Sequence, residues 1–189
     1  MSKRIIIPIV WLMTACVVPN FTAAQAAETV HVQIPVVPAR AEDVSSPEAI
    51  VTADLECLSG GVGVARQWAR DASLYDPHAR FVAMGIDPRT GAVTKHSSNV
   101  QEFADQADTS LVKQGFTERE LGHEVHRYGN VATVLSSYEG KYAATGKVDA
   151  RGVNIYQLYF DGKRWWILSV VWDEERERNP IPPELLPKK

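Results

Sequence analysis

Histidine and serine side chains in the second half of the chain are placed to do acid–base chemistry. His123 and Ser136 stand at equal distances from the turn pair Gly129-Asn130, so pairing of the flanking runs makes them direct neighbours. A histidine with a pKa near neutrality exchanges protons readily. His123 is therefore a candidate general base, oriented by Ser136 or Tyr138. The alternative is that His123 and Ser136 only satisfy each other in the wall of a sheet.

Other side chains are candidates for contact with a ligand. Tyr138 shares the predicted face of His123, and Asn154 lies on the last long hairpin. Trp68 belongs to a predicted helical stripe, although tryptophans of this kind are often core residues. The predicted ligand-binding set is Ser136, Tyr138, Asn154 and Trp68, with His123 as the catalytic candidate.

The sequence lacks the spacings of common metal and nucleotide sites. It has no HExxH motif, no closely paired cysteines and no Asp-rich loop, and Gly60-Gly61-Val62-Gly63 has no following Lys-Ser/Thr. The net charge is -3, and no basic patch of the kind that binds nucleic acid is present. We therefore predict no metal, no cofactor and no nucleic-acid partner.

The N-terminus resembles a secretory signal. Lys3-Arg4 precede an apolar run from Ile5 to Val18, and Ala24-Gln25-Ala26 offers a small-residue cleavage site. Residues 1–26 are predicted to be a signal peptide, which makes the mature protein periplasmic or secreted in a bacterium. In the alternative, Met13 to Cys16 is a lipobox and Cys16 is lipidated, the one case in which we expect a membrane contact.

Composition divides the remaining chain into three segments. Residues 27–44 form a linker or N-terminal arm, 45–178 a single domain, and 179–189 a Pro-rich C-terminal tail. Signal cleavage leaves Cys57 as the sole cysteine, so no internal disulfide can form. Cys57 lies among apolar helical residues, which favours a small buried hydrophobe over a reactive thiol.

Three helices are predicted in the first half of the domain. The first begins at Ser45-Ser46-Pro47-Glu48 and ends at Gly60-Gly61. The second spans about 63–74. The third begins with a capping box formed by Ser98 and Gln101 and ends at Gly115.

The strands follow a different period. Ala79 to Ile86 and Ala92 to Ser97 are short candidates, and Thr117 to Tyr128 with Val131 to Tyr142 form a long hairpin. Arg151 to Asp173 forms a second long hairpin around Asp161-Gly162. Helices packed against a strongly curved antiparallel sheet make the fold class α+β.

Strand register predicts the faces of the last hairpin. If Phe160 pairs with Lys163, then Val153 opposes Val170, Ile155 opposes Leu168 and Asn154 opposes Ser169. Both faces are then substantially apolar. We expect one face to cover the helices and the other to meet a partner, which predicts a homodimer through the sheet.

The same counting assigns the faces of the hairpin around Gly129-Asn130. One face carries Val125 opposite Val134, His123 opposite Ser136, and Leu121 opposite Tyr138. The solvated reverse face is predicted to hold Glu120, Glu124, His126, Thr133 and Glu139. No acidic residue is then expected on the apolar faces of the long strands.

The sequence from about Ser45 to Glu175 resembles the nuclear transport factor 2-like superfamily, through SPEAIVTADLECLSGG, ARFVAMG, YGNVATVLSSYEG and RGVNIYQLYFDGKRWWILSVVWDEER. It is most similar to an exported, SnoaL-like branch. The resemblance implies a cone-shaped domain around an apolar pocket, often dimerised through the sheet. Enzymes of this superfamily place a buried Asp with Tyr or His in the cone to move a proton.

Three functions follow as hypotheses. The first is an exported pocket protein that binds a small, mostly apolar molecule. The second is a cofactor-free proton-transfer enzyme of the isomerase, dehydratase or cyclase type, with His123 as its base. The third is a dimerising association module. Fold resemblance alone does not choose among them.

Overall fold

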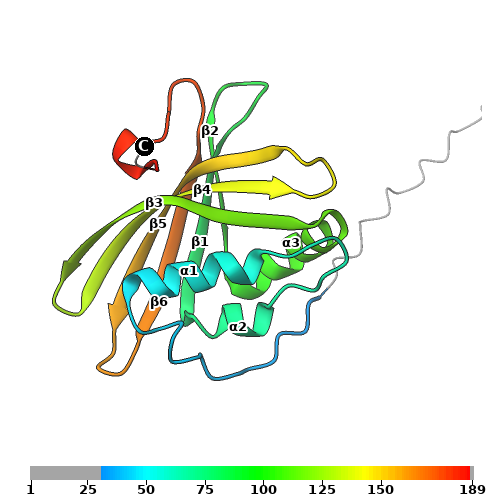
Figure 1. The fold of residues 1–189 in the computed structure, drawn as a ribbon. Coiled ribbons are helices and arrows are strands. Elements are labelled where there is room, and N and C mark those ends of the chain that lie inside the picture. Colours follow the sequence, from blue (N-terminus) through cyan, green and yellow to red (C-terminus); the bar gives the residue numbers. More distant parts are fainter. Residues whose placement is uncertain (1–30, 188–189) are drawn as a thin grey trace, which may run out of the picture.

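The computed structural model describes residues 31–187, so the predicted signal peptide (1–26) and the alternative lipidation site, Cys16, lie outside the described residues. One curved sheet dominates the fold, with three helices on its concave side (Figure 1). The helices are α1 (Pro47–Leu58), α2 (Trp68–Ala72) and α3 (Val100–Gln114). The predicted α+β class is confirmed.

The sheet has six strands in the order β2-β1-β6-β5-β4-β3. They are β1 (Tyr75–Ile86), β2 (Val93–Ser98), β3 (Phe116–Tyr128), β4 (Val131–Tyr142), β5 (Val148–Phe160) and β6 (Trp165–Glu174). Every neighbouring pair is antiparallel except β1 and β6, which run parallel. The sheet is therefore mixed, whereas the sequence predicted antiparallel pairing throughout.

Local capping explains where the first helix begins. The Ser46 hydroxyl accepts a hydrogen bond from the Ala49 N–H at 3.1 Å, and Pro47 occupies the first helical position. The predicted start is confirmed. The predicted glycine cap at the other end is wrong: α1 ends at Leu58, and Gly60 instead exchanges backbone hydrogen bonds of 2.7 and 2.9 Å with Phe116.

The other two helices differ from the prediction in their starts. The capping box of α3 belongs to Asn99 and Glu102, one residue later than predicted, because the amide side chain of Asn99 caps the Glu102 N–H at 2.9 Å. Helix α2 begins at Trp68 instead of residue 63. The chain before it turns at Gly63, whose φ of 75° is left-handed and whose N–H donates to the Val112 carbonyl at 2.8 Å.

The turn between β5 and β6 is longer than the Asp-Gly pair predicted. The Asp161 carboxylate accepts hydrogen bonds from the backbone N–H groups of Lys163 (2.8 Å) and Arg164 (2.9 Å), and this closes a four-residue loop. Phe160 therefore pairs with Trp165, not with Lys163.

A bulge then shifts the rest of this hairpin. Leu158 pairs with Ile167 but Gln157 pairs with Ser169, so Leu168 is an extra residue on β6. The predicted opposition of Asn154 with Ser169 is wrong, because Asn154 opposes Trp172.

The outer face of the sheet is partly covered by the C-terminal tail (Figure 1). Ile181 and Leu185 of the tail are buried, and Ser137 donates a hydrogen bond to the Leu185 carbonyl. Ile155 and Leu168 on this face stay exposed. The homodimer through the sheet stays a prediction.

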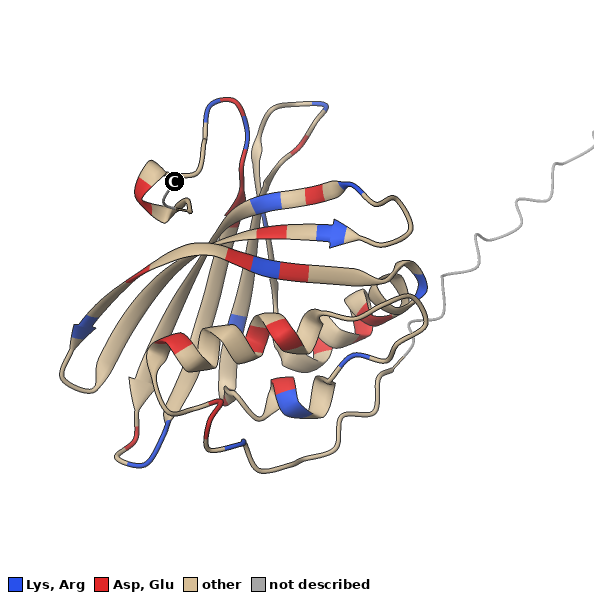
Figure 2. Cartoon of the chain, in the orientation of Figure 1, with Lys and Arg blue, Asp and Glu red and all other residues tan. Residues whose placement is uncertain are grey.

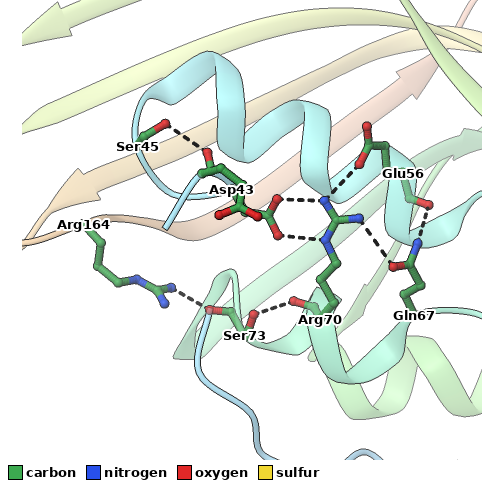
Figure 3. A network of polar contacts seen from close by, with 8 residues as sticks. Asp43, Ser45, Glu56, Gln67, Arg70, Ser73 and Arg164 are labelled. Carbon is green, nitrogen blue, oxygen red and sulfur yellow. Dashed lines mark hydrogen bonds and ion pairs between the residues drawn. The ribbon is translucent and has the colours of Figure 1, made fainter. Parts of the chain in front are cut away.

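A network of polar contacts fixes α2 against α1 (Figure 3). The Arg70 guanidinium donates to both carboxylate oxygens of Asp43 at 2.7 Å and to Glu56 at 2.9 Å. Bidentate Arg–carboxylate pairs hold their geometry well. This clamp holds α2 from outside while the next residue, Asp71, is buried beneath it.

Candidate functional site

A cavity of about 320 Å³ lies between the helices and the concave face of the sheet. Its walls are mainly apolar. Phe81, Phe103 and Trp172 form one aromatic group, with neighbouring ring centroids 5.1 and 6.2 Å apart. Phe116 and Tyr142 form another, at 5.1 Å. A volume and lining of this kind are typical of a small-molecule site.

One end of the cavity is formed by a carboxyl group between two tyrosines. Asp54, from α1, accepts hydrogen bonds from the hydroxyls of Tyr75 (β1) and Tyr156 (β5), the latter at 2.7 Å. All three residues are buried. Burial raises the pKa of Asp54, and the two tyrosine hydrogen bonds oppose this effect only in part.

A second carboxyl group faces Asp54. Asp71, from α2, is 1% exposed, lines the cavity, and its Oδ1 has no hydrogen-bond partner among the described residues. Burial, followed by the negative charge of Asp54, raises the pKa of Asp71 well above its usual range. Two carboxyl groups this close in a dry site do not both ionise readily.

Glu118 brings a third carboxyl group to the cavity from β3. Asn154 on β5 donates a hydrogen bond to Glu118 Oε1 at 3.4 Å. Burial, and then the charge of Asp54, raise the pKa of Glu118 to about 7. A carboxyl group with this pKa in an apolar pocket is suited to exchanging protons at neutral pH.

A β-bulge explains why Glu118 faces inward. His123 pairs with Ser136 and Val125 with Val134, as predicted, but Glu120 rather than Leu121 pairs with Tyr138. Leu121 is therefore an extra residue on β3. Because strand faces alternate residue by residue, one inserted residue moves every residue beyond it to the other face. The prediction that no acid lies on the apolar faces is wrong for this reason.

The structure separates the predicted site residues. Tyr138 and Asn154 line the cavity, whereas His123, Ser136 and Trp68 do not. Trp68 is buried against Phe103, and its Nε1–H donates to Asp108 at 2.6 Å.

His123 and Ser136 meet at a different carboxylate. The Ser136 hydroxyl donates to Glu120 Oε1 at 2.6 Å, and His123 Nδ1 lies 3.0 Å from Glu120 Oε2. His123 is exposed, and Ser136 is buried. The predicted placement of this pair in the pocket wall is corrected: the pair belongs to a cluster around Glu120, which was expected on the opposite, solvated face.

Sequence reasoning missed Asp54 and Asp71, although a signal for each exists. Asp54 stands three residues after Val51 and four before Leu58, on the apolar stripe of its helix. Asp71 stands three residues after Trp68. An acid at a core position of a helical period indicates a buried carboxyl group with a special environment.

Neither a metal cluster nor a membrane-spanning helix is found in the part of the chain that the structure describes. No group of three or more His, Cys, Asp or Glu side chains within residues 31–187 is arranged to hold a metal ion. No helix in the same range is long and apolar enough to cross a membrane. Cys57 is buried, and burial raises the pKa of its thiol, which confirms the predicted role as a small hydrophobe.

Known proteins resemble this chain in structure and not detectably in sequence. No family model matches it, and no curated protein is significantly similar. Two proteins of unknown function from Nostoc punctiforme, described as having a cystatin-like fold, superpose with TM-scores of 0.52 and 0.51. They are 15% and 8% identical, and the matches cover 72% and 75% of this chain and 78% and 97% of theirs.

A third similar structure is an NTF2-like protein of unknown function from Methylobacillus flagellatus. It is 11% identical with a TM-score of 0.46, and the match covers 68% of this chain and 89% of that one. Identities this low show the fold alone. The two structures with TM-scores above 0.5 show that this chain has a fold similar to the one described for them as cystatin-like. Membership of the nuclear transport factor 2-like superfamily stays a prediction from the sequence.

Proposed function

We propose that this protein binds a small, mostly apolar molecule in the cavity between the helices and the sheet. The observation that carries the proposal is the combination of aromatic walls with a buried polar end at Asp54 and Asp71. Apolar walls provide affinity by removing ligand surface from water, and a few fixed polar groups orient the ligand. No reaction is needed for this role.

Filling the cavity tests the proposal. Neutral N-phenyl-1-naphthylamine, whose fluorescence rises in apolar surroundings, is titrated into the protein. Ala107→Phe places a ring in the wall of the cavity and is expected to weaken probe binding at least tenfold. Ala92→Phe makes the same change at an exposed loop position and serves as the control. Equal binding by both variants and the wild type would exclude the cavity as the binding site.

A second candidate function is proton transfer, with Glu118 in place of His123 as the base. The observation that favours it is the position of Glu118 in the cavity, hydrogen-bonded to Asn154 and with a pKa raised to about 7. A base whose pKa lies near the working pH is half ionised and still accepts protons well. His123 is not among the residues that line this cavity.

The ring opening of 5-nitrobenzisoxazole, which begins with removal of a carbon-bound proton, measures this activity. We expect the wild-type rate to rise through about pH 7, to fall at least tenfold in Glu118→Gln, and to be unchanged in His123→Gln. A wild-type rate equal to that of Glu118→Gln at every pH would remove proton transfer by Glu118 and leave the binding proposal intact.

A further inference from the structure

The charges around the cavity are of one sign. Five acidic residues from five elements line it, namely Asp54, Asp71, Glu118, Asp149 and Glu174. Among the lining residues, all within 31–187, none is lysine, arginine or histidine. Figure 2 shows acidic residues on α1, α2 and β3, three of the elements that enclose the cavity. Anionic ligands are therefore disfavoured in it.

A missing hydrogen-bond donor gives independent evidence for a ligand. Both carboxylate oxygens of Asp54 are occupied by tyrosine hydroxyls. The protonated Asp71 carboxyl group hydrogen-bonds to Asp54, but in the ionised form Asp71 Oδ1 is buried with no donor among the described residues. Buried polar atoms without partners are rare, and each costs free energy until it is satisfied. Asp71 lines the cavity, but Oδ1 itself is closed to solvent, so a ligand group that donates a hydrogen bond reaches it only when the side chain turns toward the cavity.

The aromatic lining suits a positive charge as well as an apolar body. Ring faces carry partial negative charge and attract cations, most strongly where water is excluded. Tyr75 and Tyr156 lie beside the Asp54 and Asp71 carboxyl groups, and Phe103 and Trp172 extend the aromatic wall. One molecule with an aromatic or aliphatic body and a protonated amine can interact with both the carboxyl groups and the aromatic walls.

We propose that the ligand is an organic ammonium ion whose N–H group donates to Asp71 and whose body lies against the aromatic walls. The proposal rests on the proposed binding function and adds the chemical class of the ligand. It also implies that binding displaces protons, because a cation favours the ionised form of every carboxyl group near it. Besides the five acids, the titratable groups lining the cavity are the hydroxyls of Tyr75, Tyr138, Tyr142 and Tyr156.

Three size-matched probes test the charge preference: 2-naphthylmethylamine, 2-naphthylmethanol and 2-naphthoate. We expect the wild type at pH 8 to bind the amine at least tenfold more tightly than the alcohol, and the naphthoate most weakly. Amine affinity is expected to be several-fold higher at pH 8 than at pH 6, while alcohol affinity stays constant. Calorimetry in buffers of different ionisation enthalpy is expected to show proton release with the amine alone.

Variants assign the preference to Asp71. Asp71→Asn is expected to bring amine affinity to within threefold of alcohol affinity, whereas Glu120→Gln, outside the cavity, keeps the preference. If the alcohol binds the wild type as tightly as the amine, the ligand class is wrong and the binding function stands. If none of the three probes binds, the proposed function fails with it. The wild-type comparison decides the matter even if Asp71→Asn does not fold.

Discussion

Two carboxyl groups in this molecule have the same hydrogen-bonding pattern in opposite surroundings. Asp54 accepts from the hydroxyls of Tyr75 and Tyr156, and Glu120 accepts from the Ser136 hydroxyl and lies within hydrogen-bonding distance of His123. Asp54 is buried at the cavity, whereas the side chain of Glu120 is 25% exposed beside an exposed His123. Hydrogen bonds lower the pKa of a carboxyl group, yet the pKa of Asp54 is raised.

The comparison shows that exclusion of water has a larger effect on the pKa of Asp54 than the number of its hydrogen-bond donors. The free-energy cost of removing the carboxylate charge from water is larger than the stabilisation that two neutral hydroxyl groups provide. At the Glu120 cluster, water as well as protein groups can hydrogen-bond to the carboxylate, because its side chain is partly exposed. The predicted site residues His123 and Ser136 belong to the cluster around the partly exposed Glu120, whereas the buried acids line the cavity.

The largest difference between the regions is expected in stability. Asp54→Ala leaves two buried tyrosine hydroxyls without an acceptor and is expected to lower the free energy of unfolding by about 3 kcal/mol. Glu120→Ala is expected to cost about 1 kcal/mol, because water replaces the carboxylate. Urea denaturation of both variants measures the difference, and equal costs would refute the role of water exclusion.

A smaller effect is expected in the dependence of stability on pH. The pKa of Glu118 rises from 4.5 in the unfolded chain to about 7 in the fold, so the folded protein holds this proton more tightly. Its stabilising contribution is complete below pH 4.5 and is lost as the pH rises to 7. Because Glu118 is half-buried, we expect about 2 kcal/mol. Glu118→Gln is expected to flatten the stability profile between pH 5 and 8. Urea denaturation across this range measures it, and a profile like that of the wild type would contradict the prediction.

Removing one hydroxyl from each cluster gives a finer comparison. Tyr156→Phe is expected to cost about 1 kcal/mol, since the Asp54 carboxyl group loses a 2.7 Å hydrogen bond that water cannot replace. Ser136→Ala is expected to cost about 0.5 kcal/mol, since Glu120 keeps His123 and solvent. Thermal unfolding of both variants in parallel provides the measurement. A larger cost for the serine variant would reverse the ranking of the two regions.

The smallest effect is expected at His123. His123→Gln changes an exposed side chain outside the cavity, so the unfolding free energy is expected to change by less than about 0.5 kcal/mol. Binding of N-phenyl-1-naphthylamine is expected to be unaltered. Loss of probe binding in this variant, with the fold intact by circular dichroism, would restore His123 to the binding site.

Local signals predicted the fold well. The two-residue turn at Gly129-Asn130 and the caps at Ser46 and Gly115 follow from short-range chemistry, and each is present in the structure. Helix α2 was predicted too long, because the apolar spacing of Val64, Trp68 and Ala72 begins before the helix does. Residues 63–67 form a loop, which a hydrogen bond from the Gly63 N–H to the Val112 carbonyl of α3 holds in place.

The site was harder to predict than the fold. Asp54 and Asp71 could have been found from helical period, but their proximity depends on the packing of α1 against α2. The inward position of Glu118 depends on the bulge at Leu121, and the sequence signal for it is the neighbouring Gly122, because an isolated glycine inside a strand often marks a bulge without fixing which residue is extra. A one-residue shift in the pairing of a strand changes neither its composition nor the turn beside it, but it moves each side chain to the other face of the sheet.

The bulge at Leu121 also has a consequence for how such cavities diverge. If β3 paired with β4 without this bulge, Leu121 would oppose Tyr138, and Glu118 and Glu120 would turn toward the outer face of the sheet. Formation of a bulge at this position in a regular strand would do the reverse. Chains with this fold can therefore gain or lose an acidic cavity through a one-residue shift of register in β3, without any substitution at the acid itself.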